Sequence, residues 1–368
     1  MKDYALQLLT RMLEIYSPPT REHEISSIIL DEMKKLGFKA WRDEVGNVMG
    51  EVGEGKPTLL LCGHMDTVPE FIKPRVEGNR LYGRGAVDAK GSLAAIIVSS
   101  SKFIHEKPNG KIIVACVVEE EGLSTGFKHL LTKNIPVDYA IFGEPSGVEN
   151  ITIAYKGSLH VKISCRTETG HSSAPWLFEN AVEKCFEVWS LIKKHRFSDE
   201  DSESRFRSVS SCLMKIEGGG SASTVPSSCS IHINFRVPPQ LTPKRVLNEV
   251  ERIVEDYRVK NRKVSVQLDV EDWMDAFEAD SRSILVRSLS WAIRKVKHKQ
   301  ATLLRKTGSG DLNLLGAKLR IPAVAYGPGD SSLDHSPNEN IDVQEFLESI
   351  LVYEEAIRRL FELHAKRG

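Results

Sequence analysis

Apolar positions along the chain follow two spacings that alternate, and this alternation predicts an α/β fold. The helical spacing covers residues 3–16, 21–35, 91–104 and 124–131, whereas short, continuously apolar runs cover residues 58–62, 112–118 and 139–142. Such runs are typical of buried strands in a mostly parallel sheet with helices on both faces. Near the end of the chain the same pattern predicts helices at 281–296 and 342–364 and a strand at 322–326.

The pattern changes near Gly157. Apolar residues then alternate with polar ones from Leu159 to Cys165, which predicts a strand with one solvent-facing side. The next predicted elements are a helix at 178–195, strands at 208–216 and 228–237, a helix at 243–257 and a strand at 264–268. This order is that of a ferredoxin-like α+β domain. We therefore expect residues 158–272 to be inserted into a catalytic domain made of residues 1–157 and 273–368.

Composition excludes several classes of function. The chain has 368 residues with 50 Lys+Arg and 50 Asp+Glu, so its charge offers no case for binding nucleic acid or a membrane. No apolar run approaches the roughly 18 residues that a membrane span needs, and the N-terminus lacks a signal-peptide core. The six cysteines form no CxxC pair, as expected of reduced thiols. We expect a cytoplasmic enzyme.

Five short segments with acidic or histidine side chains follow the apolar runs or lie among glycines. Their potential metal ligands are His64, Asp88, Glu121, Glu144 and His335. Imidazole and carboxylate groups suit zinc, and also cobalt or manganese. In parallel sheets, ligands bind beyond the carboxyl ends of the strands, which is where three of the segments fall. The sequence therefore predicts a metal site.

The simplest arrangement has two divalent metals bridged by Asp88. One metal would take His64 and Glu144, and the other Glu121 and His335. Three carboxylates and one bridging hydroxide balance two divalent cations, although a single metal with a looser ligand set stays open. Asp66 lies two residues after His64, so we expect it to accept the imidazole's second N–H. Glu120 is the predicted general base.

Each segment also has an ordinary interpretation. A single histidine after a strand is more often structural, and residues 119–121 alone are more typical of a solvated acidic run. Residues 143–145 alone are typical of a turn. Burying so many carboxylates without counter-ions would be prohibitively costly. The joint pattern therefore favours the metal site.

These residues resemble the zinc-dependent deacylase and exopeptidase family, which includes acetylornithine deacetylase, succinyl-diaminopimelate desuccinylase and aminoacylase. The resemblance covers nearly the whole chain. It implies a zinc-exopeptidase-like fold, a homodimer, and a lid and dimerisation role for residues 158–272. It also implies the same five ligands, Asp66 as the ligand-orienting acid, Glu120 as the base, and a cis peptide between Asp88 and Ala89.

Residues 155–158, 305–313 and 326–330 resemble one branch of this family. That branch releases lysine or ornithine from the γ-carboxyl of the glutamate that ends a small acidic amino-group carrier protein. The resemblance implies that His171 reaches the partner's active site and that Arg236 holds a substrate carboxylate. The expected substrate-binding residues are Arg236, Thr307, Gly308, Ser309, Asp311 and Asn313.

Three alternatives stay open from the sequence. The chain could deacetylate N-acetyl-lysine or N-acetyl-ornithine, it could cleave dipeptides, or it could be a non-catalytic binding protein on the same fold. Two basic clusters could attract an acidic carrier or could be solvated helix ends. They comprise residues 193–196 and the set Arg294, Lys295, Lys297, Lys299, Arg305 and Lys306.

Overall fold

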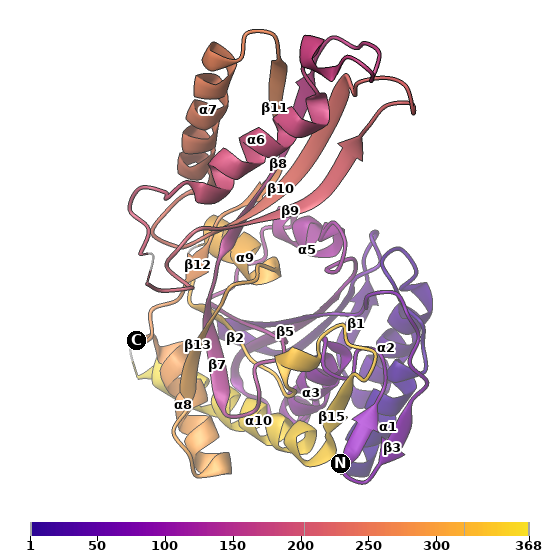
Figure 1. Cartoon of the computed structure of the whole chain (residues 1–368). Helices are drawn as coiled ribbons and strands as arrows, with labels where there is room; N and C mark the ends of the chain where they lie inside the picture. Colours follow the sequence, from indigo (N-terminus) through magenta and orange to yellow (C-terminus); the bar gives the residue numbers. More distant parts are fainter. Residues whose placement is uncertain (1, 202, 320, 367–368) are drawn as a thin grey trace. The chain divides into compact units, whose positions relative to one another are not determined.

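The computed structural model (Figure 1) describes residues 2–201, 203–319 and 321–366 and divides into two units. The first unit contains Met1–Ala154, Ala279–Arg305 and Gly310–Gly368. The second contains Tyr155–Glu278 and Lys306–Ser309. Since the chain enters the second unit at Tyr155, returns to the first at Ala279 and crosses again only at Lys306–Ser309, the second unit is an insertion.

The first unit is built on a mixed sheet. Its strands are β1 (Lys39–Arg42), β2 (Val48–His64), β5 (Asn109–Val117), β6 (Tyr139–Phe142), β7 (Asn150–Tyr155), β13 (Thr302–Lys306) and β14 (Ala323–Ala325). They run in the order β1-β2-β6-β14-β7, with β5 paired to β2 and β13 to β7. The predicted strands at 58–62, 112–118, 139–142 and 322–326 are confirmed.

Strand β2 bends around the start of β5 and pairs with it twice. Residues 48–52 pair with 116–112 in descending order, so this arm runs antiparallel, whereas residues 58–64 pair with 111–117 in ascending order. The second arm also pairs in parallel with β6. The expected mostly parallel sheet is therefore parallel in its centre, where β5, β2 and β6 lie together, and mixed as a whole.

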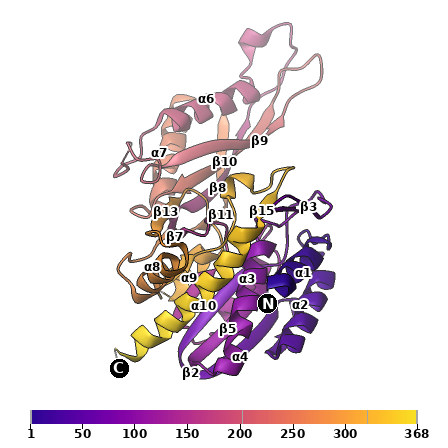
Figure 2. The same cartoon turned by 90° about the horizontal axis from the view of Figure 1, so that it is seen from below.

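Helices cover this sheet (Figures 1 and 2). They are α1 (Lys2–Leu13), α2 (His23–Leu36), α3 (Lys90–Ser101), α4 (Phe103–Glu106), α5 (Thr125–Thr132), α8 (Ile284–Lys297), α9 (Asp311–Leu319) and α10 (Val343–Ala365). Every residue of α3 is buried, because α3 packs against β2 and β5 on one side and α1 and α10 on others. Helix α10 also contacts α8, as Figure 2 shows.

A small second sheet joins distant parts of the first unit. Strands β3 (Arg75–Glu77), β4 (Arg80–Tyr82) and β15 (Asn340–Asp342) follow the order β15-β4-β3. Buried Ile341 lies opposite buried Leu81. A 3-10 turn (Ser331–Leu333) precedes β15. This pairing fixes residues 340–342 beside residues 80–82.

The second unit is a four-stranded antiparallel sheet with two helices. Its elements are β8 (Gly157–Arg166), a 3-10 turn (Pro175–Leu177), α6 (Ala181–Lys194), β9 (Ser210–Gly218), β10 (Ser228–Val237), α7 (Pro243–Lys260) and β11 (Ser265–Met274). The short strand β12 (Phe277–Glu278) follows and is not part of this sheet. The strand order β11-β8-β10-β9 is the ferredoxin-like order that the pattern predicts. Inward residues such as Ile163 and Ile231 pack against Val188 and Val250 of the helices.

Two further features bear on the sequence analysis. Among the described residues, no helix combines the length and apolarity needed to cross a bilayer. All six cysteines are free thiols; five are buried and Cys212 is exposed.

Candidate metal centre

Three predicted segments lie at the carboxyl ends of neighbouring parallel strands. His64 is the last residue of β2, Glu121 follows β5, and Glu144 follows β6. Because β5, β2 and β6 are adjacent, their ends meet at one edge of the sheet. The sheet order thus brings together groups that are up to 80 residues apart in the chain (64 to 144).

The two oxygens of Asp88 face two different imidazoles. His64 Nε2 lies 3.1 Å from Asp88 Oδ1, and His335 Nε2 lies 3.0 Å from Asp88 Oδ2. His335 Nε2 also lies 2.7 Å from Glu121 Oε1. One ligand atom each from His64, Asp88 and Glu121 falls within 4.8 Å of the others. Asp88 therefore occupies the position that a bridging ligand needs, and the Asp88–Ala89 peptide is cis, as the resemblance implies.

Charges around this cluster favour a cation. Burial raises the pKa of Glu120 far above its usual range; the His64 imidazole opposes this, and the charges of Glu144, Asp311 and Glu121 add to it. Burial and the Asp88 charge likewise raise the pKa of Glu121. A cluster of carboxylates that disfavour one another's ionised forms is the environment that divalent cations neutralise. The donor set, all imidazole and carboxylate, fits such a cation.

Histidine protonation responds to the same carboxylates. Hydrogen bonding to Asp88 raises the pKa of His335 to about 9 against the effect of burial, and Glu121 adds to the shift. Burial would lower the pKa of His64, but hydrogen bonds to Asp66 and Asp88 outweigh it and raise the pKa well above its usual range. In the protein chain alone, the protonated imidazoles of His64 and His335 therefore offset the negative charge of the carboxylates, as bound cations would.

Asp66 contacts both the imidazole of His64 and the acidic loop, residues 119–121. Its backbone carbonyl lies 2.9 Å from His64 Nδ1, and its carboxylate lies 3.4 Å from the same nitrogen. Its two carboxylate oxygens accept the backbone N–H groups of Glu120 and Glu121 at 3.1 and 2.9 Å. When His64 Nδ1 donates to this residue, Nε2 keeps its lone pair for a metal. The contact with the acidic loop could not be read from the spacing.

Two charged residues that the sequence analysis did not single out also touch the centre. Glu339 accepts the backbone N–H of Asp88 at 3.0 Å and is paired with Arg84. The available signals were weak: Glu339 stands four residues after His335, and Arg84 stands between two glycines four residues before Asp88. From the sequence alone, neither Glu339 nor Arg84 can be told apart from an ordinary charged residue on the surface, because their tertiary contacts are not visible there.

The expected substrate-binding residues fall into two groups. In the second unit, Arg236 Nη1 donates to Ser309 Oγ at 2.7 Å, and burial lowers the pKa of Arg236. In the first unit, Gly310 lies against Glu120, because a Cβ built on Gly310 would be 3.0 Å from Glu120 Oε1. Asn313 Oδ1 accepts the Gly310 N–H at 3.1 Å.

The remaining members of this set are Asp311, Thr307 and Gly308, and His171 is the residue expected to reach the partner's active site. Asp311 begins α9, and its burial raises its pKa to about 7. Thr307 precedes Gly308, beside which a Cβ would meet open space. His171 is exposed in the second unit, and its Nδ1 accepts the Ser173 N–H at 3.1 Å.

At least three of the six residues in the larger basic cluster have acidic partners. Lys295 pairs with Glu355, Lys297 with Glu348, and Lys299 with Glu149. In the cluster at 193–196, His195 pairs with Glu249 at 2.8 Å. The three lysines and His195 therefore have carboxylate partners, which favours the interpretation as solvated helix ends.

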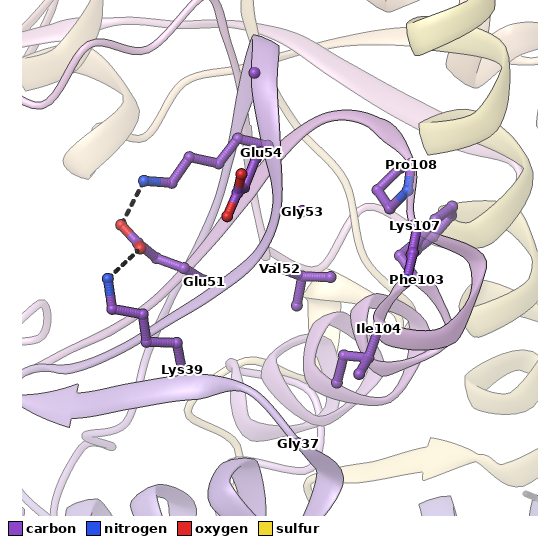
Figure 3. Close-up of a pocket in the computed structure, with 12 residues that line it drawn as sticks. Gly37, Lys39, Glu51, Val52, Gly53, Glu54, Phe103, Ile104, Lys107 and Pro108 are labelled. Carbon is purple, nitrogen blue, oxygen red and sulfur yellow. Dashed lines mark hydrogen bonds and ion pairs between the residues drawn. The ribbon is translucent and has the colours of Figure 1, made fainter.

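A cavity of about 740 Å³ lies away from the metal centre (Figure 3). It borders the first residues of β5, whereas the acidic loop follows the last residues of that strand. Figure 3 shows Lys39 beside Glu51, which also pairs with Lys111 at 2.6 Å. The described lining consists of glycine, lysine, glutamate and apolar residues, so this cavity carries none of the imidazole chemistry of the metal centre.

Comparisons with known proteins agree with this geometry. A Pyrococcus furiosus protein named as a candidate LysW-lysine/LysW-ornithine hydrolase is 38% identical over 357 residues, which cover 96% of this chain and 97% of the relative. The LysW-lysine hydrolase of Deinococcus radiodurans is 31% identical, with 97% of each chain covered.

The fold is also found among solved structures. A dinuclear metal-binding peptidase from Bacillus subtilis aligns with a TM-score of 0.78 at 12% identity, and 98% of each chain is covered. The sequence profile of peptidase family M20/M25/M40 matches residues 60–359. With metal-ligand geometry at the expected strand ends and this match over most of its length, the chain belongs to peptidase family M20/M25/M40, a family of hydrolases.

Proposed function

We propose that this protein is a two-metal amidohydrolase that releases lysine or ornithine from the γ-carboxyl of the glutamate ending a small acidic carrier protein. The observation that carries the hydrolytic part is the placement of Asp88, whose two oxygens face His64 and His335. The proposed substrate is supported by the names of the relatives. These names agree with the family branch that residues 155–158, 305–313 and 326–330 resemble.

The proposed metal ligands are His64, Asp88, Glu121, Glu144 and His335. Glu144 is half-buried at the end of β6, near enough to Glu120 for its charge to act on that carboxyl. Zinc is the proposed metal, and cobalt or manganese would suit the same donors. When bound, two such cations would polarise the amide carbonyl and lower the pKa of the attacking water.

Glu120 is the proposed general base. Its carboxyl lies against Gly310, and its backbone is held by Asp66. A base with a raised pKa accepts a proton readily near neutral pH. Glu120 would take the proton from water and return it to the amine that leaves as lysine or ornithine.

The second unit is the proposed lid and dimerisation domain, at residues 158–272. Arg236, held by Ser309 at 2.7 Å, would bind a substrate carboxylate, with Thr307, Gly308, Asp311 and Asn313 completing the substrate contacts. His171 would act in the partner subunit of a homodimer, donating to the developing oxyanion, a type of contact that contributes about 2.7–4 kcal/mol.

Parallel turnover assays test the substrate. Zinc-loaded protein would be given carrier-linked lysine, N-acetyl-lysine and a dipeptide, and the free amino acid would be measured. Strong preference for carrier-linked lysine supports the proposal. Preference for N-acetyl-lysine or the dipeptide would keep the amidohydrolase and replace the substrate, and retention of metal without turnover of any amide would favour a binding protein.

A further inference from the structure

A buried ion pair lies beside the proposed metal ligands. Arg84 Nη1 donates to Glu339 Oε2 at 2.8 Å, and the two residues are 3% and 0% exposed. Removing both charges from water is costly, so a buried pair is weak evidence of a stabilising role. The other contacts of the two side chains point to a different role.

Glu339 holds the backbone that carries Asp88. Its second oxygen, Oε1, accepts the N–H groups of Val87 and Asp88 at 2.9 and 3.0 Å. The side chain of Asp88 then directs one oxygen toward each imidazole. A change at Glu339 would therefore shift Asp88 without removing any metal-ligating group.

Arg84 holds the segment that carries His335. Its Nη1 also donates to the carbonyl of Ser336, at 3.1 Å, and its Nε donates to the carbonyl of Glu70, at 3.1 Å. The pairing of β4 with β15 brings these segments side by side, but it leaves the spacing between Asp88 and His335 to side-chain contacts. The ion pair supplies those contacts on both sides.

We propose that the Arg84–Glu339 pair is a positioning element that sets the spacing of Asp88 and His335 and thereby controls one of the two metal positions. This inference rests on the proposed two-metal function. The position shared by Asp88, Glu121 and His335 should be affected more strongly than the one that Asp88 shares with His64, because Arg84 also contacts the His335 segment. His64 is oriented by Asp66, on a different segment.

The variant Glu339→Gln tests this role. A glutamine can offer its oxygen either to Arg84 or to the two backbone N–H groups, so one set of donors loses its acceptor. Metal binding would be measured by competition with a chromophoric chelator, and the site would be examined by the visible absorption of bound cobalt. We expect one metal equivalent to bind about 10–100-fold more weakly, the usual effect of losing a residue that orients a ligand, with an altered cobalt spectrum.

Glu345→Gln is the matched control. Glu345 Oε1 likewise accepts two backbone N–H groups, those of Val148 at 2.9 Å and Gly329 at 3.1 Å, and neither residue is a proposed ligand. We expect Glu345→Gln to bind both metals as the native protein does. Arg84→Lys keeps the charge but loses the branched donor, so it should weaken the same equivalent as Glu339→Gln and serves if the latter fails to fold.

Three results would overturn the inference: unchanged affinity for both equivalents in the Glu339 and Arg84 variants, equal weakening of both equivalents, or the same effect in Glu345→Gln. These measurements need no substrate. If the native protein binds two metals but cleaves no amide, the proposed function fails, whereas the metal affinities of the variants still test the positioning role. If the native protein binds one metal only, the two-metal function fails first.

Discussion

Replacing the proposed general base should separate catalysis from metal binding. Glu120→Gln removes the proton acceptor but keeps the shape of the side chain, and the proposed ligands are unchanged. General bases contribute about 10²–10⁴-fold, equivalent to about 2.7–5.4 kcal/mol of barrier at 1.36 kcal/mol per tenfold. Because burial and the charges of Glu144, Asp311 and Glu121 raise the pKa of Glu120, we expect a loss toward the upper end.

The same variant should stabilise the metal-free protein. The pKa of Glu120 is raised in the folded chain, so folding is disfavoured increasingly as the pH rises above the usual pKa of a glutamate. A neutral glutamine removes that dependence. The assay is turnover and metal content of the loaded protein, together with thermal unfolding of the metal-free protein at neutral pH.

Glu119→Gln is the matched control. Glu119 is the neighbouring residue on the same loop, but its carboxylate accepts a hydrogen bond from the Thr125 hydroxyl. We expect near-native turnover from this variant. The reasoning would be refuted if Glu120→Gln kept nearly native activity, if it lost its metal, or if both variants lost activity equally.

Three further predictions concern pH, the substrate loop and the core. The pKa of His335 is raised from 6.5 to about 9 in the metal-free chain. Its contribution to stability should therefore be complete below about pH 6.5 and disappear as the pH rises through about 9. Thermal unfolding of the metal-free protein should show this loss of stability, and the loss should be smaller in His335→Asn. Gly310→Ala places a Cβ 3.0 Å from Glu120 Oε1, so turnover should fall by up to about a hundredfold with metal content unchanged; normal turnover would contradict this contact. Ile163→Ala removes a fully buried side chain and should cost about 2–5 kcal/mol in denaturant unfolding; a loss below about 1 kcal/mol would mean that the site collapses to fill the cavity.

The positions of three proposed metal ligands could be predicted because they depend on local signals. Each buried apolar run ends next to a polar donor, and the carboxyl ends of adjacent parallel strands meet at one edge. His64, Glu121 and Glu144 follow this rule. The inserted unit could also be predicted, since the alternation from Leu159 to Cys165 indicates a sheet with one buried face. The apolar residues of this stretch are buried and the polar ones between them are partly exposed.

Elements that depend on distant partners could not be predicted. The first arm of β2 is interrupted by glycines, and its pairing with β5 depends on residues about 60 positions away (Glu51 with Ile113). The short strands β4 and β15 have three residues each and are defined by a partner about 260 residues away (Arg80 with Asp342). Such short segments carry too little periodicity to be recognised.

The partners of charged residues could not be predicted from the sequence either. Lys295 and Lys297 look like a basic patch in the sequence, but their partners Glu355 and Glu348 lie on α10. For the same reason Glu339 resembled a solvated charge, although it is fully buried. In both cases the sequence shows one partner of a pair, and only the fold brings the other into contact.

The most direct test of the central claim is the release of free lysine from carrier-linked lysine as zinc is added back to metal-free protein. We predict no release without metal, and activity that rises and saturates at about two equivalents per chain, as expected for a two-metal site. Full activity in the metal-free protein would contradict the metal centre. Saturation of binding without any release of lysine would contradict the proposed reaction on this substrate.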